Sequence, residues 1–242
     1  QTGQDRPTFR RTERKGGQRI GFMQYRRFFD AAIGQLKNER RYRIFANLER
    51  DTSDLPRALF RADDGSERDV VIWCSNDYLG MGRHPETVKA MCETATKLDV
   101  GAGGTRNISG TNNPLVELEA ELADLHGKEA ALVFTSGWIS NLASISTIAD
   151  LMPNCLILSD SLNHNSMIEG IKRATSQRVV WRHNDVAHLE ELLAAEPHER
   201  PKLIVFESVY SMDGDIAPVK AIADLAEKYN AGYGNLGWDG VI

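Results

Sequence analysis

Residues that could bind a ligand are concentrated in the ten-residue stretch Gly101–Gly110. It holds four glycines, an arginine, an asparagine and two hydroxyl side chains. Glycine permits backbone conformations closed to residues with a Cβ, so backbone N–H groups in this stretch can turn toward a ligand. The polar side chains between the glycines can then converge on one small molecule. A Gly-rich surface loop without a ligand is the alternative, and the stretch alone does not decide between them.

The chain after this stretch alternates between strand and helix patterns. The sequence predicts strands at 130–134, 155–158, 178–181 and 203–206, and helices at 137–150, 164–174, 185–195 and 218–229. Such alternation indicates parallel βαβ units. We therefore expect an α/β fold with a mainly parallel sheet that helices cover on both faces.

Ligands of such sheets bind at the carboxyl ends of the strands. The strand ends supply the following polar stretches: Ser75 and Asn76, 135–138, Ser159 and Asp160, His183 and Asn184, and 207–211. Ser136 and Gly137 also open a helix, where free N–H groups and the positive end of the helix dipole favour a phosphate. The first chemical hypothesis is a phosphorylated cofactor lying across these strand ends. His164 follows one of the strands, and a structural and a functional role are equally open for it.

Several common motifs are excluded. No Gly-Lys-Ser/Thr closes the glycine stretch, and Arg106 stands where a dinucleotide fingerprint needs its third glycine. The sequence has no G-x-S-x-G elbow, no HExxH pair and no Cys/His spacing for zinc. We expect no metal.

Composition indicates a soluble globular protein. The formal net charge of −5 gives no general footprint for nucleic acid. Three cysteines without CxxC spacing favour a reducing compartment. The sequence has neither a membrane-length apolar run nor the apolar core of a signal peptide. A cytoplasmic location without membrane or nucleic-acid partners is the simplest expectation.

The chain is expected to fall into four segments. Residues 1–22 form a disordered basic extension, more readily explained as non-native upstream sequence than as a functional arm. Residues 23–75 form an N-terminal segment with a helix at 28–48 and a short buried strand at 70–74. Residues 76–231 contain a helix at 85–98 and another that Asn113 caps, with a buried leucine stripe. Residues 232–242 form an aberrant tail that is too rich in glycine for a central strand.

Six stretches of this sequence resemble the pyridoxal-phosphate-dependent α-oxoamine synthases. They are Tyr42–Phe45, Trp73–Gly82, Gly103–Thr111, Leu125–Leu132, Ser159–Gly170 and Phe206–Asp215. The resemblance runs from about residue 23 to 231 without large gaps. The motifs Thr-Arg-Asn-Ile-Ser and Val-Tyr-Ser-Met-Asp-Gly-Asp are similar to the corresponding motifs of the 5-aminolevulinate synthase branch.

The resemblance implies a fold, a cofactor and a reaction. The fold is the large domain of a fold type I transferase, with three α/β/α layers, a mainly parallel sheet and a small N-terminal segment. The cofactor is pyridoxal 5'-phosphate (PLP), whose pyridine ring stabilises a carbanion at the glycine α-carbon. The reaction condenses glycine with succinyl-CoA to 5-aminolevulinate, CoA and CO2, the first step of haem biosynthesis. The intact enzymes are homodimers.

The resemblance also assigns residues to the cofactor. His164 would stack on the pyridine ring, and the backbone N–H groups of Ser136 through Trp138 would hold the phosphate. Ser211 would lie near the phenolic oxygen. Trp138 stands where the family usually has tyrosine or phenylalanine.

Further residues are assigned to the two substrates. Asn76 would position the glycine carboxylate, and Arg43 would meet the succinyl carboxylate, for which a bidentate guanidinium is suited. Ser159 and Arg178 would contact CoA, with Arg178 replacing the usual lysine. The pocket for the succinyl group would be lined across the dimer interface by Thr105, Asn107 and Ile108.

Three family features are missing from this sequence. The strand after Tyr229 should carry Asp-Glu-Val-His-Ala, and a Thr-x-x-Lys with the Schiff-base lysine should follow, then a C-terminal domain. We therefore expect a truncated and inactive synthase. Two alternatives remain: a non-catalytic remnant that binds CoA or a synthase partner, and an α-oxoamine synthase with a different acyl-CoA.

Overall fold

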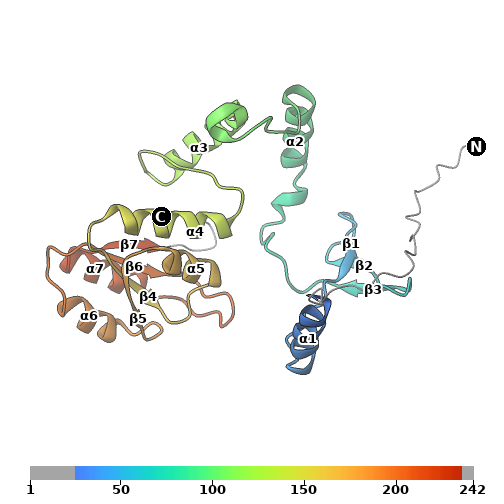
Figure 1. The fold of residues 1–242 in the computed structure, drawn as a ribbon. Coiled ribbons are helices and arrows are strands. Elements are labelled where there is room, and N and C mark those ends of the chain that lie inside the picture. The colour runs from blue at the N-terminus through green and yellow to red at the C-terminus, as the bar shows by residue number, and fades with distance from the viewer. Residues whose placement is uncertain (1–24, 236–242) are drawn as a thin grey trace, which may run out of the picture. The chain divides into compact units, whose positions relative to one another are not determined.

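The computed structural model describes residues 25–235 and divides the chain into two compact units. Unit 1 is Gln1–Val100 and unit 2 is Gly101–Ile242, so the division comes later than the predicted boundary at 75/76. The helices and strands of both units are labelled in Figure 1. The predicted extension 1–22 and residues 236–242 of the predicted tail lie outside the described residues. No helix in residues 25–235 has the length and apolar character that crossing a membrane requires.

Unit 1 contains helices and one small antiparallel sheet of order β1-β2-β3. Its elements are α1 (Tyr25–Asn38), β1 (Asn47–Glu49), β2 (Arg57–Arg61), β3 (Glu67–Val71), the 3-10 turn η1 (Met81–Arg83) and α2 (Pro85–Leu98). The helix predicted at 85–98 is confirmed. Among residues 25–100, Ala58 is the one buried residue.

Two predictions for unit 1 were wrong in part. The helix expected at 28–48 ends at Asn38 because Arg40 adopts a left-handed conformation with φ 56°, after which the chain turns back. The strand expected at 70–74 is β3, which ends at Val71 and is mostly exposed. Trp73, expected to be buried, is 94% exposed.

Unit 2 is an α/β unit around a four-stranded parallel sheet of order β5-β4-β6-β7. Its elements are the helical turn η2 (Arg106–Gly110), α3 (Asn113–Leu125), α4 (Gly137–Leu151), β4 (Leu156–Asp160), α5 (Asn165–Arg173), β5 (Gln177–Trp181), α6 (Val186–Ala194), β6 (Lys202–Phe206), α7 (Val219–Lys228) and β7 (Gly232–Asn235). The α/β prediction is confirmed, and most boundaries agree within two residues.

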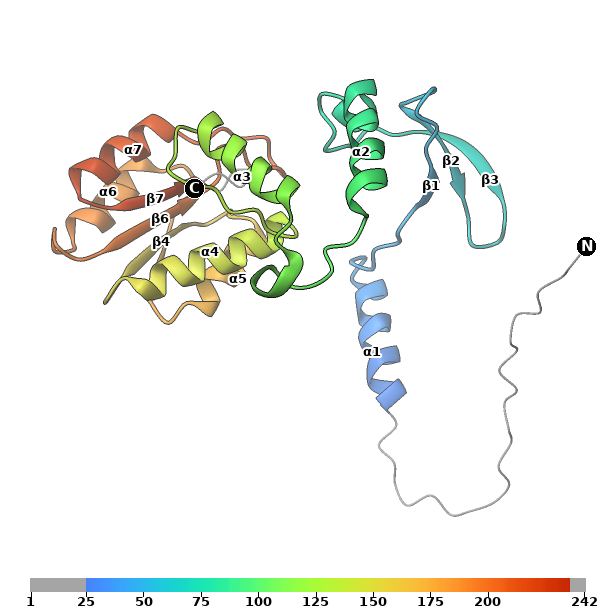
Figure 2. The same ribbon diagram turned by 90° about the horizontal axis from the view of Figure 1, so that it is seen from above.

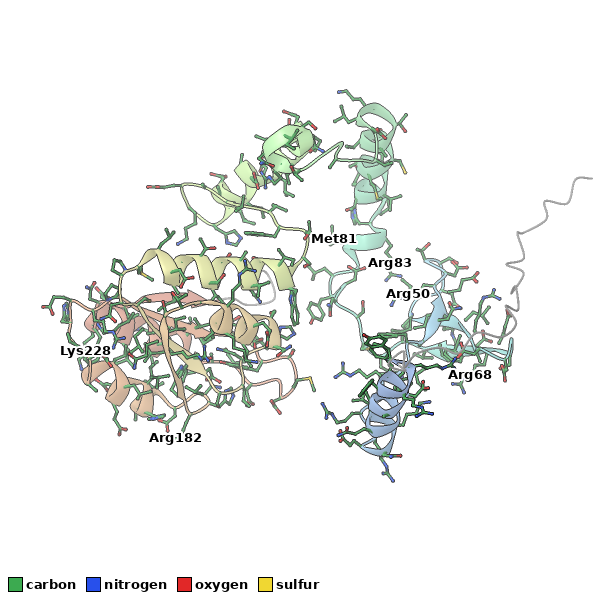
Figure 3. All side chains as sticks on the ribbon, viewed as in Figure 1. Arg50, Arg68, Met81, Arg83, Arg182 and Lys228 are labelled. Carbon is green, nitrogen blue, oxygen red and sulfur yellow. The ribbon has the colours of Figure 1, made fainter. Side chains whose placement is uncertain are left out.

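Helices cover both faces of this sheet (Figures 1 and 2). Ile157 and Val205 belong to the buried cluster with residues of α4 and α5. Leu158 and Phe206 alternate with them and belong to the cluster with residues of α6 and α7. Because both faces are buried, Leu156–Leu158 of β4 and Leu203–Phe206 of β6 are unbroken apolar runs. At the surface, the Lys228 amino group donates to Glu190 Oε1 over 2.6 Å and joins α7 to α6 (Figure 3).

The segment after Tyr229, predicted to be too rich in glycine for a central strand, begins with a strand at the edge of the four-stranded sheet. Gly232–Asn235 forms β7, which pairs in parallel with β6 in the register Leu203 to Gly232 and Phe206 to Asn235. A glycine lacks a side chain but keeps the backbone N–H and C=O groups that form a ladder. The weak strand preference of glycine therefore does not prevent pairing beside a well-formed strand.

The strand expected at 130–134 is wrong, since these residues belong to no strand in the structure. Side chains from earlier in the chain bind the backbone here instead. Val133 donates its N–H to Glu119 Oε1 over 2.8 Å, and its carbonyl accepts from Arg106 Nη1 over 3.2 Å.

Helix α3 begins one residue earlier than predicted. Its N-cap is Asn112, whose Oδ1 accepts the Leu115 N–H over 3.2 Å. The leucine stripe expected to be buried is partly exposed, with Leu118 46% and Leu125 75% exposed. The predicted stop at Gly127 is confirmed by its left-handed φ of 59°.

Candidate functional site

The first turn of α4 offers free backbone donors. Ser136 is the N-cap, and its Oγ accepts the Ile139 N–H over 3.3 Å. The N–H groups of Gly137 and Trp138 come too early in the helix to have a carbonyl one turn back. Together with the positive end of the helix dipole they can hold an anion.

His164 caps the neighbouring helix α5 and is fixed by Ser166. The Ser166 N–H donates to His164 Nδ1 over 3.2 Å, and Ser166 Oγ lies 2.7 Å from the same nitrogen. Ser166 Oγ accepts from Asn141 Nδ2 of α4 over 2.8 Å, so its own hydrogen is directed to His164. Nδ1 is thus an acceptor, and a neutral His164 carries its proton on Nε2.

The rings of His164 and Trp138 face each other edge to face, with centroids 6.1 Å apart and an interplanar angle of 81°. Gly170 allows this proximity, because a Cβ there would lie 2.8 Å from the Asn141 carbonyl oxygen and 3.3 Å from Leu142 Cα. Helices α4 and α5 therefore approach at backbone distance. An anion-binding helix start and an aromatic platform are brought together in this way.

Glu207 holds the backbone at His164 from the adjacent strand end. Its Oε1 accepts the His164 N–H over 2.5 Å. Glu207 is 4% exposed, and this burial raises its pKa, while the His164 N–H and charge act in the opposite direction. Burial also raises the pKa of Tyr210, whose hydroxyl oxygen accepts the Glu207 N–H over 3.3 Å.

Ser211 lies in a loop after β6 that we call the Ser211 loop, residues 207–217. Tyr210 donates its N–H to the Asp215 carbonyl over 2.9 Å, and Gly214 donates to the Tyr210 carbonyl over 2.8 Å. The loop thus closes on itself and leaves Ser211 exposed, on the carboxyl side of the sheet.

Three N–H groups at the end of the glycine stretch bond within the stretch itself. The N–H groups of Ile108, Ser109 and Gly110 all donate to the Thr105 carbonyl, at 3.0, 3.2 and 2.9 Å. They point into the turn rather than toward a ligand, which corrects the expectation. The Thr105 hydroxyl donates to Asn107 Oδ1 over 2.6 Å, and Ile108 is 80% exposed.

Arg106 is engaged by a carboxylate of α3. Its Nη1 and Nη2 donate to Glu119 Oε1 and Oε2 over 2.6 and 2.8 Å. These bonds, with the Val133 N–H, lower the pKa of Glu119 to about 2. Arg106 therefore fixes the turn before α3.

We expect the Arg106–Glu119 pair to persist in mild acid. Because the folded pKa of Glu119 is depressed, its stabilising effect is complete above the ordinary value of 4.5 and is lost as the pH falls through about 2. Carbon-13 NMR of the Glu119 carboxyl measures this directly. Arg106→Gln should return the titration toward the ordinary value, and an unchanged titration would contradict the assignment.

The two residues assigned to CoA are placed differently. Ser159 is 5% exposed, and its Oγ donates to the Asp160 carbonyl and accepts from Asn163 Nδ2 at 3.1 and 3.0 Å. Arg178 is exposed on β5, where its register partner is Ile157. The hydroxyl of Ser159 is thus already engaged, whereas the guanidinium of Arg178 faces solvent.

Arg43 and Asn76 are exposed residues of unit 1. The structure does not determine the position of unit 1 relative to unit 2, so their roles remain predictions. The structure brings together the four residues Ser136, Gly137, Trp138 and His164 within unit 2.

Most lysines of unit 2 are engaged away from this site. Lys172, Lys220 and Lys228 pair with carboxylates of the outer helices. Lys202, at the amino end of β6, is 1% exposed, and its amino group donates to backbone carbonyls. Within residues 25–235, no group of three His, Cys, Asp or Glu residues is arranged to hold a metal ion.

Sequence reasoning named Glu207, Asp160 and His183 as strand-end residues but gave them no role. All three have buried or half-buried polar contacts in the structure. The sequence feature that marked these three residues was their position at the ends of apolar strands. The partners, which lie more than 20 residues away in the sequence, were not readable from it.

The chain matches one family model and several curated proteins. Residues 68–232 match the family model of aminotransferase class I and II. The chain is 65% identical to a 5-aminolevulinate synthase of Bradyrhizobium diazoefficiens over 209 residues, which are 86% of this chain and 51% of that protein. It is 56% identical to the 5-aminolevulinate synthase of Paracoccus denitrificans, again over 86% of this chain and 51% of that protein. The chain thus spans about half the length of the curated relatives it matches.

Solved structures give the same result. The chain is similar to serine palmitoyltransferase of S. paucimobilis, with a TM-score of 0.73 and 30% identity over 88% of this chain and 52% of that one. It is similar to the serine palmitoyltransferase of Sphingomonas wittichii, with a TM-score of 0.70 and 27% identity over 87% of this chain and 51% of that one. The parallel sheet, its helical layers and these matches show that the chain has the fold of the fold type I PLP-dependent transferases and belongs to the aminotransferase class I and II family.

Proposed function

We propose that this chain is the part of a 5-aminolevulinate synthase that holds the phosphate and one ring face of PLP. The observation that carries the proposal is the juxtaposition of the α4 helix start with the His164 ring in unit 2. An anion-binding helix start beside an aromatic ring suits a phosphorylated aromatic ring. The identity of 65% to a 5-aminolevulinate synthase supports the choice of reaction.

Each residue of the site has a task that its contacts allow. The Gly137 and Trp138 N–H groups hold the phosphate, and the hydrogen bonds from Ser166 orient the His164 ring as a stacking platform. The exposed Ser211 hydroxyl offers a hydrogen bond from the loop that follows the adjacent strand β6. When bound, PLP supplies the electron sink that stabilises a carbanion at the glycine α-carbon.

The substrates are glycine and succinyl-CoA in this proposal. Asn76 and Arg43 bind the two carboxylates, and the exposed Arg178 offers a cation to the CoA phosphates. We also propose a homodimer, with Thr105, Asn107 and Ile108 facing the partner. The exposed apolar side chain of Ile108, 80% exposed in unit 2, supports this.

Binding of PLP to the 242-residue chain tests the proposal. We expect His164→Ala to weaken binding about three- to tenfold, because an aromatic contact contributes about 0.5–1.5 kcal/mol. His198→Ala, an exposed histidine near the amino end of β6, is the matched control and should bind as the parent chain does. Titration followed by PLP absorbance gives both constants. Equal affinity of the parent chain and His164→Ala would exclude the stacking role.

The reaction and the acyl donor need a second experiment. We would join residues 23–231 to the remaining half of the Bradyrhizobium diazoefficiens relative and compare succinyl-CoA with acetyl-CoA. Aminolevulinate formed from succinyl-CoA supports the proposal, whereas a preference for acetyl-CoA supports a different α-oxoamine synthase. CoA binding by the 242-residue chain without PLP binding would support a non-catalytic remnant.

A further inference from the structure

His183 links three separate parts of unit 2. It follows β5, and its Nδ1 lies 2.9 Å from Oδ1 of Asp160 at the end of β4. Its Nε2 lies 3.2 Å from Oδ2 of Asp215 in the Ser211 loop. In the sequence, Asp160 lies 23 residues before His183 and Asp215 lies 32 residues after it, and no sequence motif connects them.

The Asp160 carboxylate sets the direction of the first bond. Its side chain is fully buried, and it accepts backbone N–H groups of Leu162 over 2.8 Å and Asn184 over 3.1 Å. An acceptor that already holds two N–H donors takes a third from His183 Nδ1. The Nδ1 proton of His183 is therefore fixed, and only Nε2 changes its role with protonation.

The two polar neighbours of His183 Nε2 require opposite protonation states of this nitrogen. Asn184 Nδ2 lies 3.1 Å away and can donate to a neutral ring. Asp215 accepts a hydrogen bond only if Nε2 carries a proton as well. The ring also meets the edge of Tyr210, with centroids 4.4 Å apart. Arg182, the adjacent cation, pairs with Asp185 over 2.7 Å.

We propose that His183 is a positioning residue which, as an imidazolium, joins the buried Asp160 to Asp215. This bridge fastens the Ser211 loop to the end of β4, and through it the hydroxyl of Ser211. The bridge itself stands without the proposed function, and only the use of Ser211 toward PLP rests on that function.

The charges around His183 favour the bridged state near neutral pH. Burial acts to lower the pKa of His183, but the hydrogen bonds and charges of Asp160 and Asp215 outweigh it and raise the pKa above its ordinary value. Glu207 is the other carboxyl beside Asp160. Because the folded pKa is raised, the bridge is complete below the unfolded pKa and is lost as the pH rises through the folded pKa.

The experiment measures loop order and His183 titration in the 242-residue chain without PLP. Nitrogen-15 NMR follows the imidazole, and hydrogen exchange follows the Tyr210 and Gly214 amides, which flank Ser211. In the parent chain, we expect protection at both amides, corrected for intrinsic exchange, to fall about two- to fivefold as His183 loses its proton, the range of a partly exposed ion pair. Asp215→Asn should abolish this step and lower the pKa of His183.

Asp213→Asn is the matched control, because it makes the same change in the same loop at an exposed carboxylate. It should keep the pH-dependent step. His183→Asn retains a donor toward Asp160 but does not reach Asp215, so it should leave β4 protected and the loop unprotected at every pH. Equal protection in the parent chain, Asp215→Asn and His183→Asn would overturn the proposal.

The result separates this inference from the proposed function. A normal His183 response without PLP binding leaves the bridge intact and rejects the cofactor. PLP binding with a pH-independent loop rejects the bridge and leaves the cofactor site standing.

Discussion

Replacing Lys202 with methionine is expected to lower the free energy of unfolding of unit 2 by about 3 kcal/mol or more. The amino group of Lys202 donates to the carbonyl oxygens of Pro197 and Arg200 over 2.9 Å and to those of His198 and Tyr229 over 3.2 Å. Methionine fills nearly the same volume but leaves these acceptors without the donor. Four part-buried carbonyl oxygens then lose a charged donor, and those that water does not reach carry their desolvation cost uncompensated.

Removing a buried charge is stabilising in some proteins, when both partners are replaced by apolar groups. That exchange is not available at Lys202, because its partners are backbone carbonyls that no substitution removes. Urea unfolding followed by far-ultraviolet circular dichroism measures the difference. Lys220→Met, at an exposed lysine that pairs with Asp224, is the control and should change stability by less than about 0.5 kcal/mol. Equal midpoints for the two variants would contradict the role of Lys202.

The second large effect is expected at Gly170, where α5 crosses α4. An alanine Cβ would lie 2.8 Å from the Asn141 carbonyl oxygen and 3.2 Å from Ile145 Cβ, so one helix must shift. We expect a loss of about 1–3 kcal/mol, the usual cost of overpacking a core. The same shift separates Trp138 from His164, so PLP affinity should fall as well.

Gly137→Ala provides the comparison, because nothing lies within 4 Å of the added Cβ. Its unfolding midpoint should stay close to that of the parent chain. Thermal unfolding of the two variants and PLP titration of Gly170→Ala are the measurements. A Gly170→Ala variant with unchanged stability and affinity would show that the helix contact is not tight.

Local patterns predicted the layers of unit 2 but not its polar bonds. The apolar runs of β4 and β6 and the caps of the helices were readable, because periodicity and capping act over a few residues. The strand at 130–134 was wrong because Val133 bonds to the side chains of Arg106 and Glu119, which lie in another element. Such competition between side chain and strand is decided by tertiary structure.

For the candidate site too, local features were predicted from the sequence and long-range contacts were not. The Ser136–Trp138 helix start and His164 were predicted from strand ends and from family resemblance, and they lie together in the structure. The prediction failed for the N–H groups of residues 108–110, because glycine density shows where the backbone is free but not which acceptor an N–H group finds. The bridge at His183 joins residues too distant in sequence for any spacing rule.

The placement of glycine in β7 has a consequence for how the sheet opens. Gly232 and Gly234 pair with Leu203 and Val205, so both fall on the face covered by α4 and α5, and neither adds a side chain to that core. Because no side chain of these two residues packs on this face, β7 depends more on its backbone hydrogen bonds to β6, each of which contributes about 0.5–1.5 kcal/mol. The sheet should therefore open in steps, with β7 detaching first while β4 and β6 remain closed until the whole unit unfolds.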